Sequence, residues 1–216
     1  MKKVACIHST FVTVEDVKKI FTEKFPTVQL INIVDDSLLP EVLEKKQLTP
    51  GLIRRVCKYS LEAEALGASA VLMICTSLGE VDETVQKMLN IPFLRIDKPM
   101  MEKAVKLGSR IAVIASADST LEPSARLVEK VARQSGKDVT VRRYFVEGAF
   151  DALLVEKDRD KHNRLIVDKV KQAAQENDVV VLAQGSMMHL LPLLQDVQKP
   201  VLTSVIMGVE QVQSYL

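Results

Sequence analysis

The segment Cys75-Thr76-Ser77 brings a thiol and two hydroxyl groups to a point where a predicted strand gives way to a predicted helix. The unbroken apolar run of residues 70–74 is typical of a buried central strand, and Ser77 and Glu80 have the spacing of a helix capping box. Unpaired backbone amides at a helix N-terminus lower the pKa of a thiol and bind carboxylate groups. We therefore expect Cys75 to act as an acid or a base on a small carboxylate that Thr76 and Ser77 help to bind.

The other two cysteines fit structural positions. Cys6 lies within the first predicted strand, and Cys57 lies on the apolar face of a predicted helix. Free cysteine is among the most buried residue types, so we expect both in the core. The three cysteines lack the CxxC spacing of metal and redox sites, and this sparse set indicates a reducing, cytoplasmic environment.

Small hydroxyl and amide groups also follow several other predicted strands. They are Ser9, Thr10, Ser116, Ser119, Thr120, Gln184, Gly185, Ser186, Thr203 and Ser204. Helix capping accounts for many residues of this kind. All of them, however, fall on the side of the sheet where Cys75 falls, without an accompanying Arg or Lys. This distribution predicts a small carboxylate held by main-chain amides and hydroxyl groups.

Two acidic positions have a structural and a functional interpretation. Asp97, between a predicted strand and Pro99, either orients a polar substrate group or closes a turn. The pair Asp35-Asp36 follows the second predicted strand, and we interpret it as loop structure.

The three histidines differ in their expected roles. His189, shortly after Gln184, is a candidate second base, although a surface or capping position is the alternative. His8 ends the first predicted strand near the proposed site and has the same two interpretations. His162 lies in a charged helical segment, where we expect it to be solvated.

Short β-branched runs alternate with helical patterns along the chain, which predicts an α/β fold with mostly parallel strands and crossover helices. Thr13 and Asp16 have capping-box spacing, Thr49 and Pro50 mark another helix start, and Gly67 marks its end. The predicted strands are residues 4–8, 28–34, 70–74, 93–96 and 110–115, and the predicted helices are 14–24, 50–66, 79–89 and 100–107.

The two halves of the chain resemble each other. The segments that begin at residues 3, 71 and 91 match those that begin at 110, 180 and 199, with offsets of 107, 109 and 108 residues. The repeat predicts two similar Rossmann-like or flavodoxin-like lobes related by a pseudo-twofold duplication. We assign residues 1–97 and 205–216 to one lobe and 98–204 to the other, and we expect the ligand in a cleft between them.

Composition excludes several classes of partner. The formal net charge is +1, no block of like charge occurs, and aromatic residues make up only 4% of the chain, so we expect neither nucleic-acid nor membrane binding. The longest stretch without charged residues, 179–195, is too short and too polar to span a membrane. No dinucleotide or P-loop motif and no cluster with metal-ligand spacing occurs, so no cofactor or metal is predicted.

Five segments together resemble the aspartate/glutamate/hydantoin racemase superfamily over nearly the whole chain. They are ICTSLG at 74–79, IDKPM at 96–100, IASADSTLEP at 114–123, GAFD at 148–151 and VLAQGS at 181–186. The resemblance implies cofactor-independent carbon-acid chemistry on a small carboxylate, with one cysteine from each lobe on opposite faces of the substrate carbon. Cys75 matches the first of these cysteines. Gln184 or Gly185 stands where the second is expected.

A single cysteine leaves three functions open. Racemisation or isomerisation is the commonest outcome in the family, but it needs a second proton carrier on the far face. Decarboxylation followed by protonation on one face needs only one thiol, as in the related arylmalonate decarboxylases. A protein that binds a small carboxylate without transforming it is the third possibility. The resemblance also implies a homo-oligomer.

Overall fold

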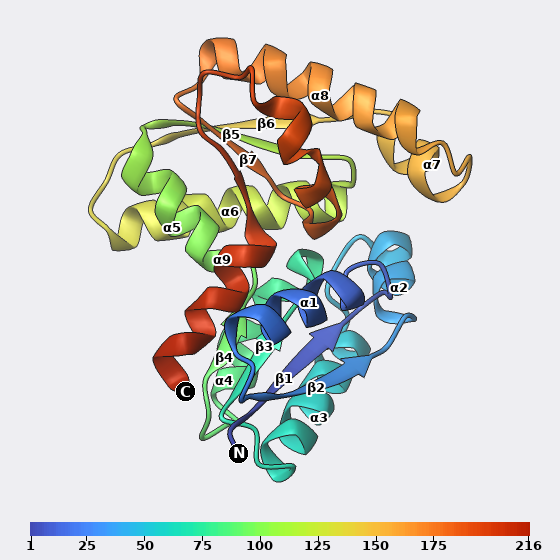
Figure 1. Ribbon diagram of the computed structural model, residues 1–216, viewed down its shortest axis with the longest axis vertical. Coiled ribbons are helices and arrows are strands. Elements are labelled where there is room, and N and C mark those ends of the chain that lie inside the picture. Colours follow the sequence, from blue (N-terminus) through green and yellow to red (C-terminus); the bar gives the residue numbers. More distant parts are fainter. The chain divides into compact units, whose positions relative to one another are not determined.

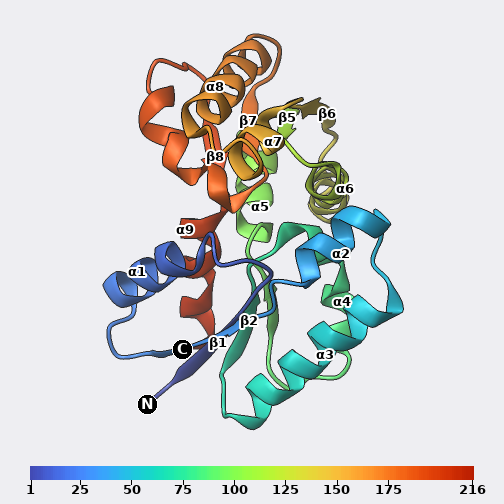
Figure 2. The ribbon, with the colours of Figure 1, turned by 90° about the vertical axis from the view of Figure 1, so that its right-hand side faces the viewer.

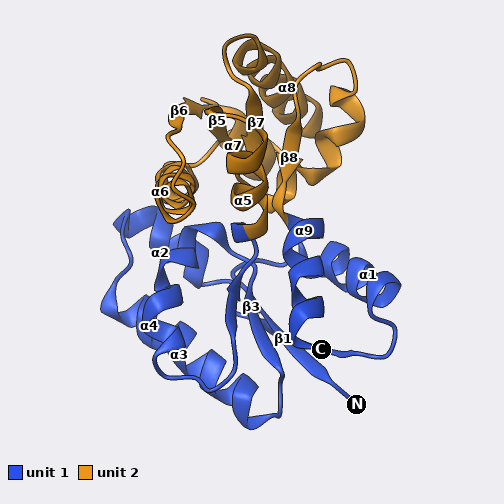
Figure 3. Ribbon diagram, turned by 90° about the vertical axis from the view of Figure 1, so that its left-hand side faces the viewer, with its two compact units in different colours: residues 1–98, 205–216 blue, residues 99–204 orange.

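The computed structural model describes residues 1–216. The chain divides into two compact units, one made of Met1–Lys98 and Val205–Leu216 and the other of Pro99–Ser204 (Figure 3). Each unit contains one four-stranded parallel sheet with helices on both faces. The α/β class and the two similar lobes are therefore as predicted.

The first unit is built around the strand order β2-β1-β3-β4. Its helices α2, α3 and α4 cover one face of the sheet, and α1 and the C-terminal helix α9 cover the other (Figure 2). The elements in chain order are β1 (Lys3–His8), α1 (Val14–Lys24), β2 (Gln29–Val34), α2 (Leu38–Lys45), α3 (Pro50–Ala65), β3 (Ala70–Met73), the 3₁₀ helix η1 (Thr76–Val81), α4 (Asp82–Gln86) and β4 (Phe93–Arg95).

The second unit repeats this plan with the strand order β6-β5-β7-β8. Helices α5 and α6 lie on one face of its sheet, and α7, α8 and the 3₁₀ helix η2 lie on the other (Figure 1). The elements are α5 (Lys98–Leu107), β5 (Arg110–Ala115), α6 (Asp118–Gln134), β6 (Thr140–Phe145), α7 (Ala149–Leu154), α8 (Arg159–Glu176), β7 (Val179–Leu182), η2 (Gly185–Leu194) and β8 (Val201–Thr203).

The central strands explain why both sheets are stable. Every residue of β3 and β7 is buried, because helices cover both faces of a parallel sheet. Side chains on β1 and β3 that face α2 and α3 form the core of the first unit, and their counterparts on β5 and β7 face α7 and α8 in the second. The apolar runs that predicted these strands are thus the two hydrophobic cores.

Of three local sequence signals for a helix start, the one at Thr49 forms as predicted and the other two do not. Thr49 accepts a hydrogen bond from the Leu52 amide and caps α3, as predicted. Thr13 precedes α1 but makes no capping hydrogen bond, so the predicted capping box does not form. The helix predicted at 79–89 is instead η1 followed by the short α4, because the chain tightens into a 3₁₀ turn directly after β3.

A buried ion pair joins β4 to the turn that follows it. Arg95 and Asp97 are 4% and 0% exposed, and two parallel hydrogen bonds of 3.0 Å and 2.9 Å connect them. Asp97 lies in the bend between β4 and α5, in agreement with the turn interpretation, and its buried carboxylate is engaged by Arg95 rather than open to solvent. It is the partner of a guanidinium that the sequence did not single out.

The end of the chain returns to the first unit through α9 (Ser204–Glu210) and the 3₁₀ helix η3 (Gln211–Tyr215). Gln211 donates a hydrogen bond of 2.8 Å to the carbonyl oxygen of Arg95. Gly208 packs so closely on Ile96 that a Cβ atom there would collide with the Ile96 carbonyl oxygen and side chain. Glycine at 208 is what allows α9 to lie against β4. No helix in the structure has both the length and the apolar character that a membrane crossing requires.

Gly208→Ala should therefore lower the free energy of unfolding by about 1–3 kcal/mol, because the added methyl group forces α9 away from the backbone of Ile96. Urea denaturation followed by circular dichroism measures this change. Gly51→Ala is the matched control, since that helical glycine has its nearest non-neighbouring atom at 3.5 Å. Equal stabilities of the two variants would contradict the close-packing account.

Candidate active site

The first unit places Cys75 beside Ser9 at the carboxyl ends of its two central strands. Ile7 on β1 lies opposite Met73 on β3, and the Ile74 amide donates to the Ile7 carbonyl at 2.9 Å. Two residues beyond that pair, the Ser9 hydroxyl is hydrogen-bonded to the Cys75 side chain. Parallel register alone thus brings together a thiol and a hydroxyl that are 66 positions apart in the sequence (75 minus 9).

Cys75 is also the residue from which η1 starts. Its backbone is still extended, with φ −100° and ψ 113°, and the chain turns into η1 at the next residue. The Ser77 amide and hydroxyl are hydrogen-bonded to the Cys75 side chain. The Leu78 amide donates to the Cys75 carbonyl oxygen at 3.1 Å and also acts to lower the pKa of the thiol. The predicted capping by Ser77 is wrong, because Cys75 occupies the N-cap position and Ser77 lies inside the helix. The amides nevertheless converge on the sulfur, as a helix start should arrange them.

Burial decides the acidity of this thiol. Cys75 is only partly exposed and packs against the apolar core. Burial raises the pKa of the Cys75 thiol above its ordinary value, and the hydrogen bonds from Ser9, Leu78 and Ser77 offset only part of that rise. We expected the helix start to lower the pKa, and that expectation is wrong because desolvation of the thiolate outweighs the donors. At neutral pH the group is a protonated thiol.

Two more of the predicted site residues lie next to this pair. Thr10 follows Ser9, and its hydroxyl accepts a hydrogen bond of 3.3 Å from the Val12 amide, which shapes the loop after β1. Thr76 is buried in the first position of η1. The hydroxyl-bearing residues predicted in the first half of the chain therefore follow the carboxyl ends of β1 and β3.

The second unit carries a copy of the Ser9–Cys75 pair in which the thiol is replaced by an amide. Ile114 on β5 lies opposite Leu182 on β7, and the Ala183 amide donates to the Ile114 carbonyl at 2.9 Å. Two residues beyond, Ser116 and Gln184 are side by side. Gln184 starts η2 as Cys75 starts η1, with φ −110° and ψ 131°. Gln184, not Gly185, is thus the structural equivalent of Cys75.

Hydrogen bonds fix the orientation of the Gln184 side chain. Its Oε1 accepts from the Ser116 amide at 2.7 Å and from the Ser116 hydroxyl at 3.0 Å. With the oxygen doubly engaged, the Nε2 group is left as the donor end. This side chain can donate a hydrogen bond to an anion, but it cannot carry a proton between substrate and solvent.

The remaining predicted residues of the second unit lie at the carboxyl ends of β5, β7 and β8. Ser119 and Thr120 are in the first turn of α6, and Thr120 is buried. Gly185 and Ser186 begin η2. Thr203 ends β8 and Ser204 begins α9, both of them buried.

His189 is tied to its own unit by both ring nitrogens. Nδ1 is 2.7 Å from the Ser186 carbonyl oxygen, and Nε2 is 2.8 Å from Oδ1 of Asn163 on α8. The exposed ring also stacks on His162 with 6.4 Å between ring centroids. His162 itself is 1% exposed and bonds through Nδ1 to the Ala149 carbonyl, so its predicted solvation is wrong. It occupies the buried face of an otherwise charged helix.

His8 lies at the carboxyl end of β1 but faces away from Cys75. Side chains alternate along a strand, so Ile7 and Ser9 face the same side as Cys75 and His8 faces the other. Its Nε2 is 3.0 Å from Oδ1 of Asn32, and burial lowers the pKa of the imidazole, which keeps it neutral. We assign it no proton-transfer role.

The other ionisable candidates have structural surroundings. Cys6 and Cys57 are buried, as predicted, and burial raises the pKa of each thiol. No group of three or more His, Cys, Asp or Glu side chains is arranged to hold a metal ion.

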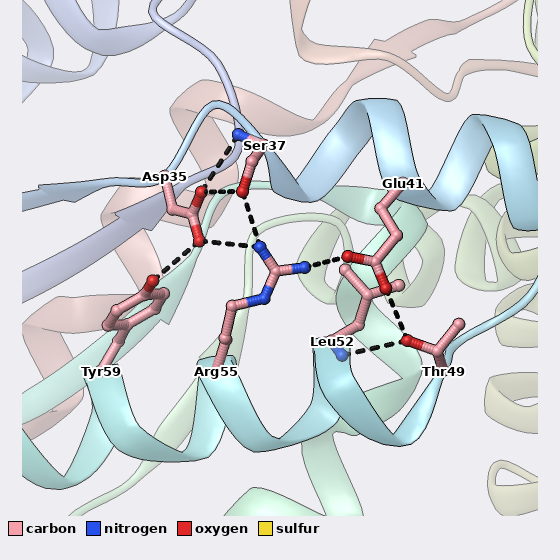
Figure 4. Close-up of polar contacts among 7 residues, drawn as sticks. All are labelled: Asp35, Ser37, Glu41, Thr49, Leu52, Arg55 and Tyr59. Carbon is pink, nitrogen blue, oxygen red and sulfur yellow. Dashed lines mark hydrogen bonds and ion pairs between the residues drawn. The ribbon is translucent and has the colours of Figure 1, made fainter.

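Asp35 belongs to a polar cluster that fastens α2 to α3 (Figure 4). It accepts hydrogen bonds from the Ser37 amide and hydroxyl and from the Tyr59 hydroxyl, and it pairs with Arg55 at 3.3 Å. Arg55 also pairs with Glu41 of α2. The interpretation of Asp35 as loop structure is correct, although the loop is more firmly held than the sequence indicated.

Comparison with known proteins agrees with this architecture. An Asp/Glu/hydantoin racemase family model matches residues 6–212. No curated protein sequence matches the chain. Allantoin racemase from Klebsiella pneumoniae is 13% identical, with a TM-score of 0.71 over 99% of this chain and 87% of that one.

Two further solved structures share the fold. Glutamate racemase from Aquifex pyrophilus is 17% identical, with a TM-score of 0.73 over 99% of this chain and 84% of that one. A glycine-to-cysteine mutant of arylmalonate decarboxylase, in its sulfate-associated form, is 17% identical, with a TM-score of 0.63 over 99% and 92% of the two chains. Because the family model covers nearly the whole chain, the protein belongs to the Asp/Glu/hydantoin racemase family.

Proposed function

We propose that the protein is a cofactor-independent enzyme that transfers a proton at the α-carbon of a small carboxylate, with Cys75 as the acid or base. The observation that carries the proposal is the position of Cys75 in a chain of the racemase family. Its thiol lies at the carboxyl end of a central parallel strand, with donors from Ser9, Ser77 and Leu78 directed at it. Ligand sites of open α/β sheets lie at this edge.

Proton transfer at the α-carbon requires two kinds of group from the first unit, a proton carrier and hydrogen-bond donors. The thiolate of Cys75 accepts the α-proton, or the thiol delivers one to the carbanion, and the enolate charge that develops on the carboxylate needs donors nearby. The amide and hydroxyl of Thr76, at the start of η1, are suited to that charge, whereas the Ser77 and Leu78 donors already serve Cys75. No Arg or Lys is required for the carboxylate, because backbone amides at a helix start bind anions. We propose the substrate class, a small amino or related acid, on this basis.

Gln184 favours one particular form of this chemistry. A two-base racemase needs a proton carrier on each face of the α-carbon, whereas the duplicate of Cys75 in this chain is an amide held by Ser116. An amide stabilises an enolate oxygen but does not exchange protons at neutral pH. The second candidate function is therefore one-sided: loss of carbon dioxide from a malonate-type acid, followed by delivery of the Cys75 proton to one face of the resulting carbanion.

Incubation of amino, hydroxy and malonic acids with the protein in heavy water separates the possibilities. Exchange at the α-carbon with loss of optical rotation supports racemisation, and release of carbon dioxide with an optically active product supports one-sided protonation. A thermal shift on ligand addition without exchange or gas release would mean that the chain binds its ligand without transforming it, which would overturn both candidate functions.

Cys75→Ser should abolish turnover and leave the fold intact, because a serine hydroxyl is far too weak an acid and base to replace the thiol. Product formation and far-ultraviolet circular dichroism measure the two parts of this prediction. Cys57→Ser is the matched control and should retain wild-type turnover, since Cys57 is buried in the core of the same unit. Wild-type activity in the Cys75 variant would remove that residue from the mechanism.

The raised pKa of the Cys75 thiol predicts a distinctive pH dependence. If the thiolate abstracts the α-proton, exchange should rise about tenfold per pH unit from pH 6 to pH 8, because only the thiolate is active and its fraction grows tenfold per unit below the pKa. If the thiol donates the proton after decarboxylation, the rate should stay level over this range and fall at higher pH. A proton-abstraction rate that already levels off near pH 6 would contradict the buried, weakly acidic thiol.

Gln184→Cys should add racemisation to a one-sided enzyme, because it restores a thiol at the structural equivalent of Cys75. Chiral chromatography of the product measures the change, and the enantiomeric excess should fall. Gly185→Cys is the matched control, one residue further along and inside η2, and should leave the excess unchanged. An undiminished excess in a folded Gln184→Cys variant would show that position 184 does not face the reacting carbon.

A further inference from the structure

The guanidinium of Arg95 lies directly against the segment that carries the Cys75 donors. A Cβ atom on Gly79 would be 2.6 Å from Cζ, Nε and Nη2 of Arg95, so only glycine fits at this point of η1. Gly79 is two residues from Ser77 and one from Leu78, whose amides both favour the Cys75 thiolate, and the Leu78 amide also donates to the Cys75 carbonyl oxygen at 3.1 Å. The position of the guanidinium therefore limits how far this part of η1 can approach the sheet.

The guanidinium in turn is held in one place. Asp97 fixes it through two hydrogen bonds, from Nε to Oδ1 at 3.0 Å and from Nη2 to Oδ2 at 2.9 Å. Glu80 of η1 and Asp82 of α4 add their charges, and Gln211 donates to the Arg95 carbonyl. A bidentate Arg–carboxylate pair defines both the distance and the plane of the group, which a lysine does not.

The register of β4 on β3 places the Arg95 guanidinium on the same face of the sheet as Cys75. Arg95 on β4 lies opposite Met73 on β3, so its side chain leaves the sheet on the same side as Met73 and Cys75. The Ile96 amide also donates to the Met73 carbonyl at 3.1 Å, which holds this register at the end of the strand. The guanidinium and the thiol thus contact the same short helix from neighbouring strands.

We propose that Arg95 is a positioning residue for Cys75: locked by Asp97, it supports Gly79 and so sets where the Ser77 and Leu78 amides meet the sulfur. The consequence of this positioning for catalysis rests on the proposed function of Cys75. The effect on the acidity of the thiol is independent of that function. Each amide that moves off the sulfur removes a donor to the thiolate. The thiol should then become less acidic even if no substrate is ever found.

The test measures thiol acidity without turnover. The pH profile of Cys75 alkylation by iodoacetamide is followed by peptide-resolved mass spectrometry, so that Cys6 and Cys57 need not be removed. Gly79→Ala keeps the Arg95–Asp97 pair and pushes η1 away from it, and Arg95→Lys keeps the charge without the bidentate plane. Both should slow alkylation at pH 8, Gly79→Ala by about three- to tenfold, the effect of losing one hydrogen bond, and should displace the profile to higher pH.

Two controls keep the result interpretable. Removal of one member of a buried pair destabilises a fold strongly, so the pair is removed as a unit in Arg95→Met with Asp97→Leu, which should slow alkylation as Gly79→Ala does. Arg110→Met disrupts an exposed Arg–Asp pair of the second unit and should leave the profile unchanged. A wild-type profile in folded Gly79→Ala or in the folded double variant would overturn the proposal. Inactivity of the wild-type enzyme on every acid tested would instead count only against the proposed function.

Discussion

The register of parallel strands is the constraint on which this protein depends. Because β1 and β3 pair in register, Ser9 and Cys75 emerge together at the carboxyl edge of the first sheet. The same register between β5 and β7 brings Ser116 and Gln184 together in the second. The duplicated fold thus produces two copies of one local arrangement, a serine next to the residue that starts a 3₁₀ helix. What differs between the copies is the chemistry of that residue.

The environment of Cys75 combines opposing effects. Burial against the core disfavours the thiolate, and the surrounding amides and hydroxyls favour it. The balance leaves a protonated thiol, which is a suitable donor to a carbanion and a base only when the substrate is acidic enough or the pH high enough. The amide of Gln184 cannot act as an acid or a base in this way, because it donates hydrogen bonds and does not ionise. The function that we propose combines one proton carrier, Cys75, with one fixed hydrogen-bond donor, Gln184.

The sequence predicted those features that depend on local patterns. Apolar runs located the central strands, the internal repeat located the two units, and the strand-to-helix transition located Cys75. It did not predict Arg95 as a buried partner of Asp97, because a charged residue on a short strand normally indicates exposure; their i, i+2 spacing, which puts both on one face, was the available signal. His162 and the direction of the Cys75 pKa were missed for a shared reason. Burial at a single residue depends on packing between elements far apart in sequence.

The proposed function requires the Cys75 sulfur to reach the reacting carbon of a bound acid. A crystal structure with an unreactive carboxylate analogue measures this most directly. We expect the analogue's carboxylate at the start of η1, on the Thr76 amide and hydroxyl, with its α-carbon about 3–4 Å from the Cys75 Sγ. An analogue bound with its α-carbon out of reach of that sulfur, or at another edge of either sheet, would contradict it.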